Sequence, residues 1–236
     1  SHELRSPIAV IQTNVQVALA DPDPDPQSQQ QHLQVVERLT RRLGKLVDDL
    51  LFLARQDSGI VQLQWEAIAL DGLLTEILEE QHAVAAEKAI AITLTAIAPD
   101  APDPTRPPAD SWATLQGDRD QLARLFTNII DNAVHYTPPG GSIALTLQRG
   151  GRLGSGTLQV TVTDTGIGIP AEAIPQLFER FFRVDPARRS SAKGGSGLGL
   201  AIAAAIVQSH HGQIQITSPE AQGTTVQITL PQKQPD

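Results

Sequence analysis

The chain has 236 residues, of which 40% are hydrophobic and only 3% aromatic, and its formal net charge is -8. This length suits two ordinary domains or one large one, with cores built from Leu, Ile, Val and Ala. The acidic balance disfavours general nucleic-acid binding, which needs a basic surface. Because the chain has no Cys, disulfides and Cys-based metal sites are excluded. No apolar run approaches the length of about 18 residues that a membrane-spanning helix needs.

Two helices are expected at the N-terminal end. Apolar residues recur at spacings of three and four from Ser1 to about Ala20 and again from about Gln27 to Asp57, which is the pattern of packed helices. The alternating Asp and Pro residues at 21–26 should separate them, because Pro lacks an amide donor and disfavours helical backbone before it. The apolar seams are Leu4, Ile8, Ile11, Val15 and Ala18 in the first helix and Val35, Leu39, Leu43, Leu46, Leu50 and Leu53 in the second.

One such hairpin has a narrow apolar seam and no second layer to cover it. Two hairpins packed as a four-helix bundle would bury both seams, so a homodimer is expected. The alternative is that the hairpin packs against the rest of its own chain. The sequence shows no signal peptide. Because it has no Met and opens at Ser1 inside a predicted helix, we expect it to be part of a longer protein.

Beyond Gly59 the pattern changes to a mixture of strands and helices. Strands are predicted near 61–68, 90–97, 142–148, 157–163, 213–217 and 224–230, and helices near 70–88, 119–135, 171–178 and 197–210. A loop rich in Pro, Asp and Ala is expected at 99–111 and a mobile stretch at 183–196. The predicted fold is α+β: a helical hairpin domain over 1–58, then an α/β sandwich over 59–236 with helices layered on a mixed sheet.

A carboxylate followed by two glycines stands at the end of a predicted strand. Asp164 is followed by Thr165, Gly166, Ile167 and Gly168. The carboxylate can accept a hydrogen bond from a ligand amino group, and the glycines let the backbone approach a flat ring closely. Taken alone, the pattern could also be a turn in which Asp bonds its own backbone.

Two further segments suit a phosphorylated ligand. The run from Gly194 to Leu200 opens an apolar helix, where free amides and the helix dipole favour phosphate, although it matches neither a Walker loop nor a Rossmann fingerprint. Asn128 and Asn132 share one helix face, and amide oxygens can bind Mg²⁺ beside phosphates. In isolation these segments could be a flexible hinge and a solvated helix face.

The sequence begins with a histidine placed for nucleophilic chemistry. On a helical wheel, His2 points away from the face defined by Leu4 and Ile8, and Ser6 lies beside it one turn later. The adjacent carboxylate of Glu3 can hold the proton on one ring nitrogen while the other nitrogen attacks.

These segments, in this order, resemble the sensor histidine kinase family over essentially the whole chain. The His2 segment resembles its H box, Asn128–Thr137 its N box and Asp164–Pro170 its G1 box. Phe178–Arg183 resembles the F box, and Gly195–Gly199 the G2 box. The resemblance implies a dimerisation and histidine-phosphotransfer hairpin followed by an ATP-binding domain of the Bergerat fold. It also implies autophosphorylation from ATP and Mg²⁺ and transfer to an aspartate of a response regulator. The expected location is the cytoplasm, with any membrane anchor in a missing upstream segment.

The resemblance also implies a role for individual residues. His2 matches the phosphoacceptor, Glu3 its neighbouring acid, Ser6 the residue that positions water for dephosphorylating the regulator, and Arg183 a contact to the terminal phosphates. Asn132 matches the Mg²⁺ ligand, with Asn128 close to the metal and phosphates. Asp164 matches the residue that reads the adenine amino group, and Tyr136 the ring beside the base. The remaining expected nucleotide contacts are His135, Gly166, Gly168, Lys193, Gly195, Ser196, Gly197, Leu198, Gly199 and Thr224.

Three positions depart from the family pattern. His135 stands where Lys is frequent, so one phosphate contact could depend on pH. Ser6 lacks the methyl group of the more usual Thr, which leaves the phosphatase activity open. The Asp-Pro run between the helices is unusual, so phosphorylation within a subunit and across the dimer both remain open.

Three alternative functions fit the sequence less well. A chaperone-type or gyrase-type ATPase would hydrolyse ATP with a carboxylate one turn before Asn132, where this chain has Asn128, a poor general base. A kinase that phosphorylates Ser on a partner would lack the His-bearing hairpin. A non-catalytic scaffold would not need an intact Asn132 and Asp164.

Overall fold

The computed structural model describes residues 2–21, 25–59, 62–97, 112–150, 156–184, 196–219 and 222–233. They divide into two compact units, residues 1–58 and residues 59–236. Among the helices of these ranges, none is both long and apolar enough to cross a membrane.

The first unit is a hairpin of two helices, α1 (His2–Ala20) and α2 (Pro26–Asp57). The second helix begins one residue earlier than predicted because Asp25 caps it. The Asp25 carboxylate accepts a hydrogen bond from the Ser28 amide at 3.0 Å, and Pro26 occupies the first turn, where its missing amide hydrogen costs nothing. The run of Asp and Pro therefore starts the second helix as well as ending the first.

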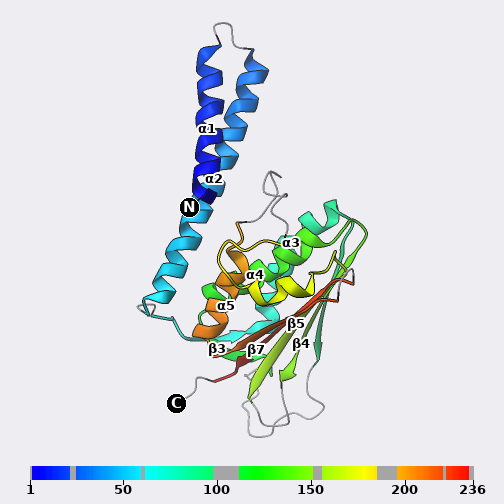
Figure 1. Cartoon of the computed structure of the whole chain (residues 1–236). Helices are drawn as coiled ribbons and strands as arrows, with labels where there is room; N and C mark the ends of the chain where they lie inside the picture. Colours follow the sequence, from blue (N-terminus) through cyan, green and yellow to red (C-terminus); the bar gives the residue numbers. More distant parts are fainter. Residues whose placement is uncertain are drawn as a thin grey trace. The chain divides into compact units, whose positions relative to one another are not determined.

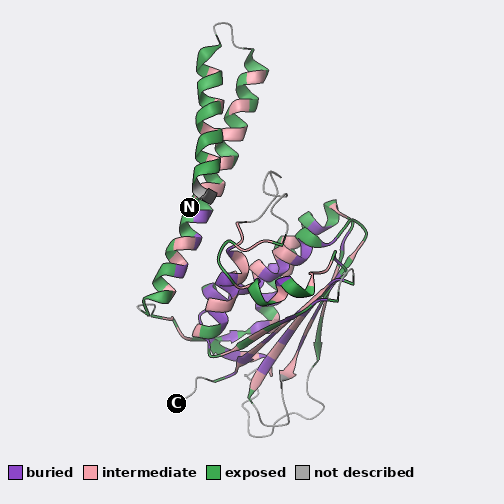
Figure 2. Cartoon of the chain, in the orientation of Figure 1, coloured by how far each residue is buried: buried purple, intermediate pink, exposed green. Residues whose placement is uncertain are grey.

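Part of the apolar seam of the hairpin is exposed, although Leu46 and Leu53 of α2 are buried. The side chains of Ile8 and Val15 are 42% and 40% exposed, and Figure 2 shows both helices exposed along most of their length. One polar contact joins the helices, from the Nδ1–H of His32 to Oδ1 of Asn14 at 2.9 Å. Within the hairpin itself, no second layer of helices covers the side chains of Ile8 and Val15.

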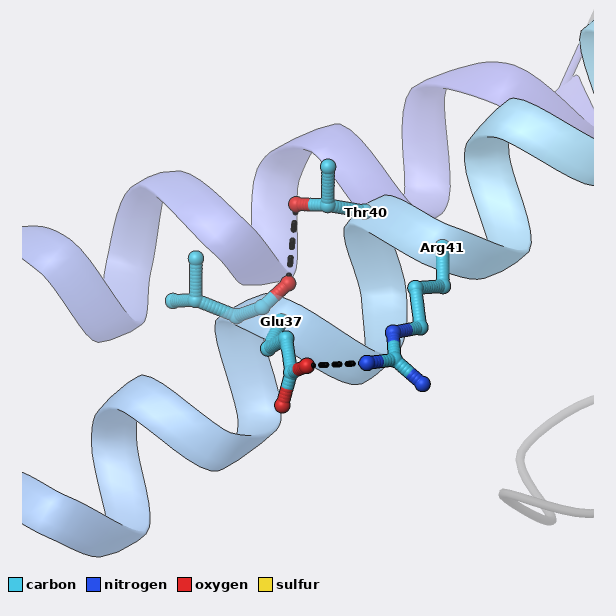
Figure 3. Close-up of polar contacts among 4 residues, drawn as sticks. Glu37, Thr40 and Arg41 are labelled. Atoms are coloured by element: carbon cyan, nitrogen blue, oxygen red, sulfur yellow. Dashed lines mark hydrogen bonds and ion pairs between the residues drawn. The ribbon is translucent and has the colours of Figure 1, made fainter.

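Polar contacts between residues of α2 lie on its exposed side (Figure 3). Arg41 pairs with Glu37 one turn earlier at 2.6 Å, and the Thr40 hydroxyl donates to the Val36 carbonyl at 2.9 Å. Exposed ion pairs of this kind contribute little to stability. We therefore expect packing of the apolar seam, rather than these pairs, to hold the hairpin in place.

The second unit contains a five-stranded mixed sheet with strand order β2-β4-β5-β7-β6. The pair β2–β4 is parallel and the other pairs are antiparallel. Helices α3, α4 and α5 lie against one face of the sheet (Figure 1). The bounds are β1 Glu66–Ala69, α3 Leu70–Glu87, β2 Ala91–Ile97, β3 Thr114–Gly117, α4 Arg119–Tyr136, β4 Ser142–Gly150, β5 Thr157–Asp164, the 3₁₀ helix η1 Ala171–Gln176, α5 Gly199–Ser209, β6 Gln213–Thr217 and β7 Thr224–Pro231.

Alternation along the strands decides which face meets the helices. On β5, Leu158, Val160 and Val162 are at most 1% exposed, whereas the intervening Gln159 and Thr161 are half-buried. Because side chains alternate across a strand, the apolar set forms one continuous core with the helices. The α+β prediction, a helical hairpin followed by a mixed sheet layered with helices, is confirmed.

One local expectation was wrong, and one short strand had no clear signal in the sequence. Residues 62–65 are not a strand; β1 begins at Glu66 and pairs antiparallel with β3, a short strand that the sequence analysis missed. The short helix expected near 171–178 is present as a 3₁₀ helix ending at Gln176, and Pro175 has no amide hydrogen to donate to a fourth-previous carbonyl. The expected loop at 99–111 and most of the stretch at 183–196 lie outside the described residues.

Candidate functional site

Asp164, the last residue of β5, is a buried carboxylate, 7% exposed. Its Oδ1 accepts hydrogen bonds from the amides of Gly166 at 2.7 Å and Thr224 at 3.2 Å. Its Oδ2 has no hydrogen bond from any residue that the structure describes. Burial raises the pKa of Asp164 above its ordinary value, and the two amides oppose this rise. One carboxylate oxygen is thus held in place, and the other is available to a ligand that donates a hydrogen bond.

Two glycines leave room for the backbone to close around Asp164. A Cβ at Gly166 would lie 2.6 Å from Oδ1 of Asp164, and a Cβ at Gly223 would lie 1.9 Å from its carbonyl oxygen. Gly223 also has φ +85, a backbone conformation that other residues rarely adopt. Gly168 has φ 71 and turns the chain after Asp164. The expectation that Gly166 and Gly168 let the backbone approach a flat ring concerns a ligand and stays a prediction.

The C-terminal end of α4 lies beside this loop. The carbonyl of Tyr136 accepts a hydrogen bond from the Ile167 amide at 3.4 Å. The Tyr136 ring is 40% exposed and meets His135 edge to face, with 4.7 Å between the ring centroids. Lys88 at the end of α3 donates to the carbonyls of Val134 at 2.6 Å and His135 at 3.2 Å, which fixes the last turn of α4.

Asn128 and Asn132 share the half-buried face of α4. The Nδ2 group of Asn128 is buried and has no hydrogen-bond partner among the described residues. At the N-terminus of α5, a Cβ at Gly199 would lie 3.5 Å from Oδ1 of Asn128, so the amide packs where α5 begins. A buried amide without a partner beside a helix N-terminus fits a ligand that brings its own oxygen atoms.

Metal binding at this position would depend on amide oxygens. Within the described ranges, no group of three or more His, Cys, Asp or Glu residues could hold a metal ion. The oxygens of Asn128 and Asn132 are hard ligands of the kind that Mg²⁺ accepts together with phosphate and water. The residues present therefore fit a cation that arrives with a phosphorylated ligand.

The F-box and G2-box segments contact each other through their backbones. The Phe181 amide donates to the Gly197 carbonyl at 2.9 Å, and a Cβ at Gly197 would meet the Phe181 backbone at 2.9 Å. The Ser196 hydroxyl accepts from the Leu198 amide at 3.3 Å, and Leu198 is fully buried. Arg183 lies half-buried two residues beyond Phe181. Two expected contacts, Lys193 and Gly195, lie outside the described residues.

The predicted phosphoacceptor lies in the first unit. The backbones of His2 and Glu3 are helical, in the first turn of α1, and their side chains lie outside the described part of the chain. Ser6 follows His2 by one turn and is exposed. The structure therefore places these residues on one helix.

One residue of the site, Ser218, was not among the residues predicted from the sequence. Its hydroxyl accepts a hydrogen bond from the Ile169 amide at 2.8 Å and donates to the Gly223 carbonyl at 2.7 Å. It therefore joins two loops that are separated by about fifty residues of sequence. A single Ser after a strand carries no pattern that distinguishes it from an ordinary surface residue.

The fold and site define a class of protein: a helical hairpin joined to a domain of the histidine-kinase-like ATPase type. Residues 117–234 match the family described as histidine kinase-, DNA gyrase B- and HSP90-like ATPase. Residues 1–59 match the family described as the His Kinase A (phospho-acceptor) domain. The chain belongs to the sensor histidine kinase family.

The sequences of known sensor histidine kinases match nearly the whole of this chain. It is 35% identical to the sensor histidine kinase RppB of Synechocystis over 98% of this chain and 47% of that protein. It is 32% identical to the sensor histidine kinase WalK of Bacillus subtilis over 99% of this chain and 36% of that protein. The chain therefore spans half or less of the length of these relatives.

Solved structures show the same fold. Acinetobacter baumannii histidine kinase AdeS superposes with a TM-score of 0.72 at 22% identity, over 98% of both chains. Full-length ShkA in complex with AMPPNP gives a TM-score of 0.69 at 25% identity, covering 98% of this chain and 44% of that one. The histidine kinase ThkA in complex with response regulator protein TrrA gives 0.70 at 20% identity, covering 98% and 59%.

Proposed function

We propose that this chain is the phosphotransfer and catalytic portion of a sensor histidine kinase. It binds ATP in the second unit, moves the γ-phosphoryl group to His2 and passes it to an aspartate of a response regulator. Residues 1–58 act as the dimerisation and phosphotransfer domain, and residues 59–236 as the ATP-binding domain. The observation that carries the proposal is the buried Asp164, with one oxygen fixed by two amides and the other available.

Asp164 is the adenine-reading residue of this proposal. Its available oxygen would accept a hydrogen bond from the exocyclic amino group, and the main chain at Gly166 and Gly168 would lie against the base. Tyr136 would cover the open side of the base. A resemblance to ShkA, whose structure holds AMPPNP, supports this assignment.

The phosphate end of the nucleotide would lie between α4 and the N-terminus of α5. The orphaned amide of Asn128 and the packing of Gly199 against it support this position. Asn132, with Asn128 nearby, would hold Mg²⁺, which neutralises charge on the phosphate oxygens when bound. Arg183 and His135 would contact the phosphates, and the stretch containing Lys193, Gly195 and Ser196 would close over them.

His2 is the proposed phosphoacceptor. The unprotonated ring nitrogen forms a bond to the γ-phosphorus, the bond between that phosphorus and the bridging oxygen breaks, and ADP leaves. Glu3 takes up the proton on the other ring nitrogen as the ring becomes positively charged. Ser6, one turn along α1, would orient water during dephosphorylation of the regulator.

Two partners follow from this reading. A second copy of the chain would cover the exposed seam at Ile8 and Val15, giving a four-helix bundle. A response-regulator receiver domain would accept the phosphoryl group, as the complex of ThkA with TrrA suggests. We infer a cytoplasmic location, where ATP is supplied, and this is compatible with a membrane anchor elsewhere in the parent protein.

The experiment is incubation with γ-labelled ATP and Mg²⁺, using His2→Ala and, as a matched control, His82→Ala. His82 is an exposed histidine on α3, away from the motifs. We expect acid-labile, base-stable label on the unmodified chain and on His82→Ala, and none on His2→Ala. Label that survives His2→Ala would contradict the phosphoacceptor assignment.

The same reactions separate the rivals. Release of inorganic phosphate without protein label would indicate a hydrolytic ATPase, and nucleotide binding without either product would indicate a scaffold. Adding a receiver domain to the labelled chain should then move the label to that domain as a base-labile acyl phosphate.

A further inference from the structure

Ser218 is a buried hydroxyl at the junction of two loops. It follows β6 directly and is 8% exposed. Its Oγ donates to the Gly223 carbonyl at 2.7 Å and accepts from the Ile169 amide at 2.8 Å. The Thr224 hydroxyl lies 3.3 Å away. Because a hydroxyl has one proton and two lone pairs, the Thr224 hydroxyl must be the donor in that last contact.

Each of the two loops that Ser218 joins carries an amide that donates to Asp164. Ile169 stands in the segment that runs from Asp164 through Gly166 and Gly168. On the other loop, the Thr224 amide donates to Oδ1 of Asp164 at 3.2 Å. The α-carbon of the adjacent Gly223 lies so close that a Cβ there would be 1.9 Å from the Asp164 carbonyl oxygen.

This geometry makes the orientation of Asp164 depend on the loop that carries Thr224. If the Gly223–Thr224 turn moved, the Thr224 amide would no longer hold Oδ1, and the carboxylate could rotate about its last side-chain bond. The second amide donor, Gly166, is local to Asp164 and would follow it. The contact through Thr224 therefore fixes the carboxylate relative to the Gly223–Thr224 turn, and Ser218 fixes that turn.

We propose that Ser218 is a positioning residue that sets the base selectivity of the nucleotide site. By pinning the Gly223–Thr224 turn to the Ile169 segment, its hydroxyl keeps the available oxygen of Asp164 aimed at the position of the adenine amino group. This rests on the proposed function, because it assumes that Asp164 reads that group. Because this role concerns recognition, changes at Ser218 should alter nucleotide affinity and the preference for ATP more than the rate of phosphoryl transfer.

The variants are Ser218→Ala, Ser218→Thr and Ser218→Cys in the full chain. Ala leaves the Ile169 amide and the Gly223 carbonyl without their partner, Thr keeps the hydroxyl, and Cys keeps the volume with a weak donor and acceptor. Ser209→Ala is the matched control. Its hydroxyl also donates to a main-chain carbonyl, that of Ile206 at 2.9 Å, but at the end of α5 far from Gly199.

Dissociation constants are measured for ATP, GTP and the triphosphate of purine riboside, which lacks the amino group. In Ser218→Ala we expect ATP affinity to fall about tenfold and the preference for ATP over the other two to shrink by a similar factor. Ser218→Thr should keep the preference, and Ser218→Cys should lie between. For autophosphorylation, KM for ATP should rise while kcat at saturating ATP stays within about twofold.

A purely structural serine would behave differently. It would lower the unfolding midpoint and weaken all three nucleotides equally, and that result overturns the proposal. An unchanged ATP preference in Ser218→Ala, or an equal loss in Ser209→Ala, also overturns it. If Ser218→Ala does not fold, the same comparison is made with Ser218→Cys. Failure of the unmodified chain to bind ATP would instead refute the proposed function.

Discussion

The main-chain amide of Asp118 donates a hydrogen bond to Nε2 of His210 at 3.1 Å. The other ring nitrogen, Nδ1, faces the Ile206 carbonyl at 2.8 Å, so the proton is on Nδ1 and the imidazole is neutral. The Asp118 side chain caps α4 through the Gln121 amide at 3.1 Å and accepts from the Gln64 amide at 3.0 Å. The start of α4, the end of α5 and the segment before β1 therefore meet at this pair.

His210 should make the free energy of unfolding decrease as the solution is acidified. Burial lowers the pKa of His210 from its ordinary value of 6.5. The attraction of Asp118 opposes this shift, and the repulsion of His211 adds to it. The unfolded chain then takes up a proton before the folded chain does. The stabilising contribution is fully present above about pH 6.5 and is lost as the pH falls toward the folded pKa.

Denaturant unfolding between about pH 8 and about pH 5 would measure this effect. His210→Gln cannot titrate, so its unfolding free energy should vary less over this range than that of the unmodified chain. An equal slope in the two proteins would show that other groups cause the pH dependence. His82→Gln, a change at an exposed histidine, is measured in parallel as the matched control.

Asp164→Asn should separate stability from function. Burial raises the pKa of Asp164 from 3.8, so its contribution is present below about pH 3.8 and lost as the pH rises through the folded pKa. This raised pKa therefore disfavours folding at pH values above about 3.8, so Asn should be no less stable at pH 7. ATP affinity should fall at least about tenfold, because an amide NH₂ would face the adenine amino group. Calorimetric unfolding and nucleotide titration check both parts, and a destabilised variant would contradict the first.

Two glycines with similar backbone angles should respond very differently to alanine. Gly223 has φ +85 and no space for a Cβ, whereas Gly140 has φ +80 and nothing within 4 Å. Gly140→Ala bears the conformational cost alone, about 1 kcal/mol. Gly223→Ala adds a backbone clash and should cost several kcal/mol or prevent folding. Urea unfolding of both variants makes the comparison, and equal losses would mean that the turn at Gly223 can shift.

Lys88 should stabilise the last turn of α4. Its ammonium group donates to two carbonyls at the helix C-terminus, where positive charge is favourable. Lys88→Met keeps the aliphatic stem and removes the donors, with an expected loss of about 1–2 kcal/mol. The loss should appear as a lower free energy of unfolding. ATP binding should also weaken, because Tyr136, the proposed contact to the base, directly follows the residues whose carbonyls Lys88 holds. Glu87→Gln, an exposed neighbour, is the control.

Much of the architecture could be predicted from local pattern. The periodicity of apolar residues identified α1, α2, α3, α4 and α5, and alternation identified the five strands of the large sheet, because these signals depend on neighbours a few residues apart. The motifs placed Asp164 at a strand end and Gly199 at a helix start for the same reason. The short helix expected near 171–178 is present, and its 3₁₀ geometry reflects Pro175, which changes the hydrogen-bond pattern within an otherwise helical composition.

Other features depended on pairing across the fold. The short strands β1 and β3 exist because residues 66–69 and 114–117 find each other in antiparallel register. The two donors of Asp164 are 2 and 60 residues away from it, and only the local one could be inferred from sequence. Ser218 gained its role in the same way, because the register of β5, β7 and β6 brings the Ile169 and Gly223 loops to one hydroxyl. Sequence by itself determined the elements and the candidate chemistry, since these depend on local periodicity and residue type. Tertiary structure decided which lone pairs and amides are satisfied, since that depends on contacts between distant segments.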